Sequence, residues 1–143
     1  MTKNPLILLV LCSILILSCS KGDWLRDPEG LEAEIVLIGG SCGGVKVVKI
    51  DRRFTRKSVP QNSCVPQQAE TRRETDAAVF KELTRFVEIL DLHRNPIEEC
   101  WRCVDGADYM ITLRNGSNRI EHTIALNTDN KGRQEFITFL NSL

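Results

Sequence analysis

The residues of this sequence that are best suited to chemistry are its cysteines, of which there are six in 143 residues. Cys100 and Cys103 form a Cys-x-x-Cys pair, a spacing that suits thiol–disulfide exchange. A reactive pair of this kind needs a helix that begins at its first cysteine, because the helix dipole lowers the pKa of the thiol. Here Val104-Asp105-Gly106 follows the pair and favours a turn that leads into a strand. We therefore expect a structural disulfide and keep thiol-redox activity as the alternative.

The sequence supports metal binding and hydrolytic catalysis less well than it supports a disulfide or thiol-redox activity. Structural zinc sites usually contain two close cysteine pairs, whereas this chain has one such pair plus the scattered Cys42 and Cys64. Of the two histidines, the pattern places His93 at the end of a helix and His122 on the inward side of a strand. The sequence contains no Ser-His-Asp motif, His-Glu-x-x-His pair or nucleophile elbow. We therefore expect no catalytic residue, no metal and no cofactor.

The first twenty residues have the pattern of an export signal. Lys3 supplies a short positive region, and the apolar run Leu6–Leu17 follows it. Such a run is too short for a membrane span, which needs about 20 apolar residues, but suits the core of a signal peptide. It ends in Ile16-Leu17-Ser18-Cys19, which resembles the lipobox of bacterial lipoproteins, with a bulky leucine at the tolerant position.

The resemblance implies that residues 1–18 are removed as a signal peptide and that Cys19 carries a diacylglyceryl group and an acylated amine. Two or more acyl chains anchor a protein stably at a membrane. Ser20 is not the aspartate associated with inner-membrane retention. The resemblance thus implies the cell envelope, and the outer membrane in a host with two membranes. The chain looks like other small bacterial lipoproteins that carry a compact α+β body.

Export would place the four remaining cysteines in an oxidising compartment, where an even set usually forms disulfides. Four cysteines allow three pairings, and the sequence does not choose between them. We favour Cys42 with Cys64 and Cys100 with Cys103. The alternative is that Cys100 and Cys103 each pair with a cysteine of the N-terminal half.

Charge is balanced over the whole chain, because 19 basic residues offset 19 acidic ones. This balance argues against a nucleic-acid partner. Residues 46–57 nevertheless form a basic cluster that consists of Lys46, Lys49, Arg52, Arg53, Arg56 and Lys57. We expect these side chains to protect a sheet edge against aggregation. The alternative is a patch for anionic headgroups or an acidic partner.

The elements that position these residues can be read from hydrophobic periodicity. Residues 19–33 are expected to form a polar tether behind the lipidated cysteine, and residues 34–143 a single domain. Short β-branched runs predict strands at 34–38 and 45–50, joined by a glycine-rich loop, and an irregular loop follows at 58–68. Asn115-Gly116 lies between two alternating runs and predicts a hairpin.

Two segments have helical spacing. One runs from about Thr75 to Leu92 with Asp76 as its N-cap, and the other runs from about Lys131 to Ser142 with Asp129 or Asn130 as its cap. The predicted fold is α+β, with an antiparallel sheet of four or five strands in the order ββαββα and two helices on one face. The other face is left for solvent or a partner. The predicted function is a membrane-anchored lipoprotein with a small disulfide-stabilised, non-catalytic domain that binds an envelope protein or ligand.

Overall fold

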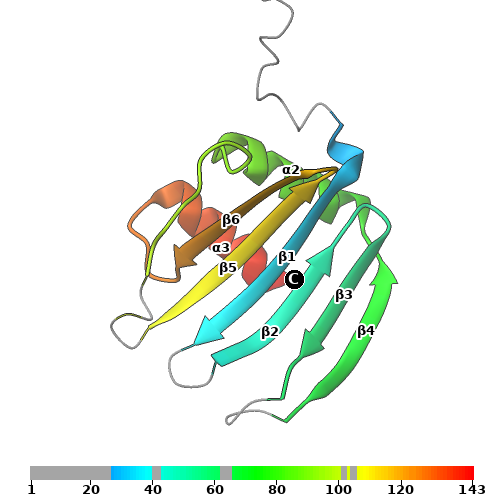
Figure 1. The fold of residues 1–143 in the computed structure, drawn as a ribbon, viewed down its shortest axis with the longest axis horizontal. Helices are drawn as coiled ribbons and strands as arrows, with labels where there is room; N and C mark the ends of the chain where they lie inside the picture. The colour runs from blue at the N-terminus through cyan, green and yellow to red at the C-terminus, as the bar shows by residue number, and fades with distance from the viewer. Residues whose placement is uncertain (1–26, 40–42, 62–65, 101–102, 104–105) are drawn as a thin grey trace, which may run out of the picture.

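The computed structural model describes residues 27–39, 43–61, 66–100, 103 and 106–143. These residues form one antiparallel sheet of six strands with two α-helices (Figure 1). The elements in chain order are η1 (Pro28–Gly30), β1 (Leu31–Gly39), β2 (Gly43–Ile50), β3 (Phe54–Val59), β4 (Gln68–Glu74), α2 (Ala77–Ile89), β5 (Ala107–Asn115), β6 (Asn118–Ala125) and α3 (Lys131–Ser142). In space the strands follow the order β4-β3-β2-β1-β5-β6. The α+β class and the antiparallel sheet agree with the prediction.

Both helices lie on the same side of the sheet, behind it in the view of Figure 1. The side chain of Asp76 caps α2 by accepting a hydrogen bond from the N–H of Ala78, and Asn130 caps α3 by accepting one from Arg133. An N-cap of this kind satisfies one of the free N–H groups of the first turn. The predicted helix 75–92 is too long at both ends, since α2 begins at Ala77 and ends at Ile89.

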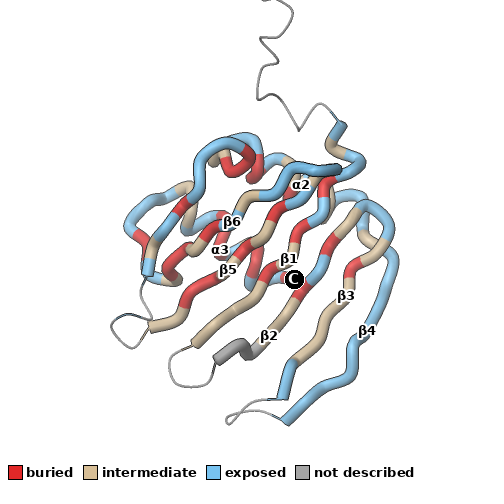
Figure 2. Tube along the Cα trace, viewed as in Figure 1, coloured by how far each residue is buried: buried red, intermediate tan, exposed pale blue. Residues whose placement is uncertain are grey.

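The buried residues lie on the inner strands and on the helices (Figure 2), and they form one hydrophobic core. Alternate strand residues face it: Ile35 of β1 lies between Val48 of β2 and Ile111 of β5, and all three are buried. From the helices, Phe86 and Phe136 meet with their ring centroids 5.0 Å apart. The apolar side chains that alternate along the strands and those on the apolar faces of the helices therefore pack together in one core.

The first strand begins earlier than expected. Leu31 and Ala33 belong to the buried core, so β1 starts at Leu31, three residues before the expected boundary at residue 34. The predicted hairpin between β5 and β6 is confirmed, and Gly116 in its turn has a positive φ of 58°. Glycine adopts this left-handed conformation without the penalty that a Cβ atom brings.

The prediction of four or five strands in the order ββαββα is wrong, because the sheet has six strands and the order is ββββαββα. The strands that were given no range are β3 and β4, and β4 lies within a polar stretch that overlaps the predicted loop at 58–68 only at Gln68. All seven of its residues are exposed, so they show no alternation of apolar and polar side chains. Backbone pairing with β3 holds β4 in the sheet, and its charged side chains suit an edge strand. Among the described residues, no helix is long and apolar enough to cross a membrane.

Candidate functional site: the open face of the sheet

The side of the sheet opposite the helices is called the open face below, and a row of charged side chains crosses it. Strand pairing places six residues in one row from edge to edge: Arg72, Arg56, Lys49, Glu34, Thr112 and Glu121. The three cations lie on β4, β3 and β2, and the two carboxylates lie on β1 and β6. The row therefore runs from positive to negative across the open face.

A hollow of about 200 Å³ opens beside this row. It is lined by Glu32, Ala33, Glu34, Lys49, Ile50, Asp51, Arg56, Thr112 and Arg114. Two ion pairs form its wall: Lys49 Nζ lies 3.3 Å from Glu34 Oε1, and Arg56 Nη2 lies 3.1 Å from Asp51 Oδ2. Exposed pairs of this kind add little stability, so their consequence is chiefly the charge pattern that they present.

Asp51 also closes the turn between β2 and β3. Its carboxylate accepts hydrogen bonds from the backbone N–H groups of Arg53 and Phe54, each at 2.7 Å. Partial burial would raise the pKa of Asp51, but these two N–H groups and the guanidinium of Arg56 hold it below its ordinary value. Asp51 is therefore a fixed negative charge that positions Arg56 at the hollow.

Two charged groups of the hollow remain available to a ligand. Glu32 and Arg114 stand directly opposite one another on β1 and β5, and neither has an ion-pair partner within 4.0 Å in the described part of the chain. Nearby, Nε of Arg56 is buried without a hydrogen-bond partner among the described residues. The hollow thus offers a carboxylate and guanidinium groups to a ligand that carries charges of both signs.

Beside the charged row, the open face carries a second row with three apolar side chains. Val47, Val36 and Met110 follow one another across β2, β1 and β5, and each is half-buried. Ser58 and Thr123 continue this row on β3 and β6. An apolar area beside a charged hollow is an arrangement typical of a protein-binding surface.

The expectation that the basic cluster protects a sheet edge is wrong, because β2 and β3 lie inside the sheet and β4 forms the edge. The structure also divides the cluster. Lys49 and Arg56 lie on the open face, whereas Lys46 and Lys57 lie on the helix side of the sheet. Arg52 and Arg53 occupy the turn between β2 and β3, and Arg52 forms an ion pair with Glu29. Because side chains alternate along a strand, a run of basic residues cannot form one patch on a sheet.

The Cys100–Cys103 pair forms a disulfide, with Cα atoms 5.6 Å apart, and both residues are exposed. The segment before it pairs with β6: the N–H of Glu99 donates to the carbonyl of Thr123 at 2.8 Å, and Thr123 donates back to Ile97. An extended segment therefore precedes Cys100. Cys42 and Cys64, like the predicted lipidation site Cys19, lie outside the described residues.

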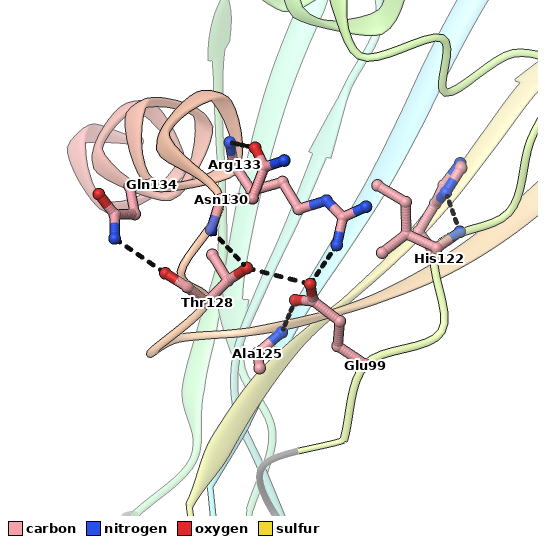
Figure 3. A network of polar contacts seen from close by, with 8 residues as sticks. Glu99, His122, Ala125, Thr128, Asn130, Arg133 and Gln134 are labelled. Carbon is pink, nitrogen blue, oxygen red and sulfur yellow. Dashed lines mark hydrogen bonds and ion pairs between the residues drawn. The ribbon is translucent and has the colours of Figure 1, made fainter.

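Glu99 was not among the candidate residues chosen from the sequence, although it lies at the centre of a network of polar contacts (Figure 3). Its carboxylate accepts hydrogen bonds from the backbone N–H of Ala125 and the hydroxyl of Thr128, each at 3.0 Å, and from the guanidinium of Arg133. These partners are 26 to 34 residues away in the sequence, so no local motif points to them. The network joins the end of β6 to the start of α3 and positions the segment that carries the disulfide.

Both histidines are buried and belong to the packed interior of the domain. His122 is 2 % exposed, and its Nδ1 accepts a hydrogen bond from the N–H of Ile97 at 3.1 Å. Burial lowers the pKa of His122 to about 4, although the backbone of Leu92 favours the charged ring. His93 is buried as well, with Nδ1 3.4 Å from the carbonyl of Val87. His122 is therefore neutral at pH 7 and packs in the core. Among the described residues there is also no cluster of three or more His, Cys, Asp or Glu side chains that could hold a metal.

A scan against models of known protein families finds no match for this chain. A search of curated proteins finds no match either.

Proposed function

We propose that this protein is a lipid-anchored lipoprotein of the cell envelope whose folded domain is a non-catalytic binding module. Its binding surface is the open face, with the hollow at Glu32 and Arg114 as the centre. The observation that carries this proposal is that both helices cover one side of the sheet, while the other side combines this hollow with an apolar area. A sheet face that no described helix covers is suited to a partner.

The charges of the hollow indicate the kind of partner. A partner segment that carries both a cation and a carboxylate would pair with Glu32 and Arg114, and its apolar side chains would cover Val36 and Met110. Charged contacts of this kind select the partner and its register, and the apolar contacts supply affinity. A segment of another envelope protein has this chemistry.

The anchor is supported by the sequence alone. Ile16-Leu17-Ser18-Cys19 has the order of residues found in a lipobox, and the first described residue, Asp27, lies only eight positions after Cys19. A chain extends by at most about 3.6 Å per residue. A lipid on Cys19 would therefore keep Asp27, where the described domain begins, within about 29 Å of the bilayer surface.

Cross-linking in intact envelopes tests the binding surface. We expect the protein to form a cross-linked product of defined mass, and the variant Glu32→Gln/Arg114→Gln to lose it. The matched control is Glu88→Gln/Lys131→Gln, which makes the same two changes of charge on the exposed parts of α2 and α3. A product of unchanged yield from the Glu32→Gln/Arg114→Gln variant contradicts the open face as the binding surface.

A thiol-redox protein is the second candidate, because the Cys100–Cys103 disulfide is accessible at both cysteines. An insulin-reduction assay with a dithiol reductant distinguishes the two functions. We expect no turnover above that of the Cys100→Ser/Cys103→Ser variant. Turnover that depends on both cysteines would favour the redox function over the binding function.

A further inference from the structure

Three basic side chains gather on the helix side of the sheet, beyond the area that the helices cover. Lys57 on β3 is the pairing partner of the core residue Val48, and Lys46 lies two positions before Val48 on the same side of β2. Arg73 on β4 is paired with the buried Thr55. Because β4 is exposed along its whole length, neither helix covers this corner. Lys46, Lys57 and Arg73 are called the cation triad below.

The cation triad differs from seven of the other twelve described lysines and arginines in having no carboxylate partner among the described residues. Seven described lysines and arginines form ion pairs with acidic residues: Lys49, Arg52, Arg56, Arg85, Arg94, Arg119 and Arg133. No triad member has a carboxylate within 4.0 Å in the part of the chain that the structure describes. The paired positions on this side of β2, β3 and β4 carry no acidic residue either, since Glu74 is paired with Phe54 on the opposite side.

Lys57 on the middle strand β3 is repelled by both of the other charges, Lys46 on β2 and Arg73 on β4. Partial burial together with the charges of Arg73 and Lys46 lowers the pKa of Lys57. Repulsion of this kind weakens a folded protein unless an anion compensates it. The triad therefore has the character of a site that is completed by an anion. Two lysines supply point charges, and the arginine supplies a planar fork that matches a phosphate group.

We propose that the cation triad binds the phosphate groups of anionic phospholipids on the surface of the bilayer, a proposal that rests on the proposed lipid anchor. The bilayer is the occupant that the geometry favours, because the triad and the open face lie on opposite sides of the sheet. When the triad lies on the bilayer, Glu32 and Arg114 face away from it and remain accessible to a partner. The short connection from Cys19 to Asp27 keeps the triad within reach of headgroups.

Binding to vesicles tests the proposal without the anchor. The core residues run from Leu31 to Leu143, so a chain that begins at Ser20 contains every described element, and cooperative urea unfolding checks its fold. We expect this chain to bind vesicles that contain phosphatidylglycerol and not vesicles of phosphatidylcholine alone. Each basic residue beside an anionic surface strengthens binding about fivefold. The triple variant Lys46→Gln/Lys57→Gln/Arg73→Gln should therefore bind on the order of 100-fold more weakly.

The matched control is Lys81→Gln/Arg94→Gln/Lys131→Gln, which changes the net charge equally at exposed positions outside the sheet. We expect the control to bind like the unchanged chain. Equal loss in both triple variants, or no binding to either kind of vesicle, overturns the proposal. Release of the protein from vesicles by inorganic phosphate at the same phosphate concentration also overturns it, because the ligand would then be a soluble phosphate. Failure of the anchor itself would appear only as absence of lipid on Cys19, which this experiment does not require.

Discussion

His122 on β6 and Ile97 in the segment after α2 are joined by a hydrogen bond of 3.1 Å, in which the backbone N–H of Ile97 donates to Nδ1 of the ring. Ile97 also accepts a hydrogen bond from the N–H of Thr123, so the segment runs along the outer edge of β6. This edge of the sheet is thereby covered, whereas the edge formed by β4 is protected by its charges.

The surroundings of His122 predict that acid destabilises the protein. The pKa of the ring falls from 6.5 to about 4 on folding, so the unfolded chain binds the proton more tightly. The contribution of His122 to the free energy of unfolding is complete above about pH 6.5 and is lost as the pH falls towards 4. The loss by pH 4 is about 3 kcal/mol, since each pKa unit corresponds to about 1.4 kcal/mol.

Urea unfolding at pH 7 and at pH 4 measures this effect, with His122→Gln for comparison. The glutamine does not titrate, and we expect it to be less stable than the wild type at pH 7 because it replaces a packed buried ring. The difference between the two proteins should shrink on acidification, by about 3 kcal/mol. A difference that is the same at both pH values would show that His122 does not cause the pH dependence.

The contacts of Glu99 predict that its removal lowers the stability of the protein, because three hydrogen-bond donors share its carboxylate. The substitution Glu99→Ala leaves the N–H of Ala125, the hydroxyl of Thr128 and the guanidinium of Arg133 without this partner. Loss of a partly buried network of this kind costs about 2–4 kcal/mol. The neighbouring Glu98→Ala is the control, and we expect less than about 0.5 kcal/mol from its exposed side chain. Similar urea midpoints for both variants would contradict a structural role of Glu99.

The sequence predicts those elements whose side chains follow a clear period. Phe86 and Val87 on α2, and Ile111 and Leu113 on β5, are buried as the spacing requires. Asp76 and Asn130 cap their helices, since a short polar side chain before an apolar stripe acts locally. These features depend on neighbours within a few residues along the chain, and periodicity therefore finds them.

The features that the sequence did not predict depend on partners that are distant along the chain. β4 is held by backbone pairing with β3, and its exposed side chains have no apolar period. Arg73 was left out of the predicted basic cluster because it is 16 residues beyond Lys57, although strand pairing brings the two charges together. Strand order decides such neighbours, and the order follows from packing of the whole sheet.

We expect removal of the Cys100–Cys103 disulfide to lower the stability of the protein only modestly. The disulfide closes a loop of only four residues, so it removes little entropy from the unfolded chain, worth about 2 kcal/mol in the chain-entropy model. We expect Cys100→Ser/Cys103→Ser to fold and to lose about this much, measured by urea unfolding at pH 7. Alkylation of the unreduced wild type with iodoacetamide, followed by mass spectrometry, should leave both cysteines unmodified. Modification of either one before reduction would contradict a stable disulfide.

The predicted anchor is tested in cells by Cys19→Ala, with Cys12→Ala as the matched control inside the same signal segment. Only Cys19 follows the small residue Ser18 at the end of the apolar run, so only its thiol should receive lipid. We expect Cys19→Ala to lose incorporation of radiolabelled palmitate and to keep residues 1–18, as seen by mass spectrometry. Cys12→Ala should be labelled, shortened to begin at Cys19 and recovered with the membranes, because the acyl chains remain. Palmitate on Cys19→Ala, or an unmodified Met1 on wild-type protein from the cytosol, contradicts the anchor and with it the oxidising compartment expected for Cys42 and Cys64.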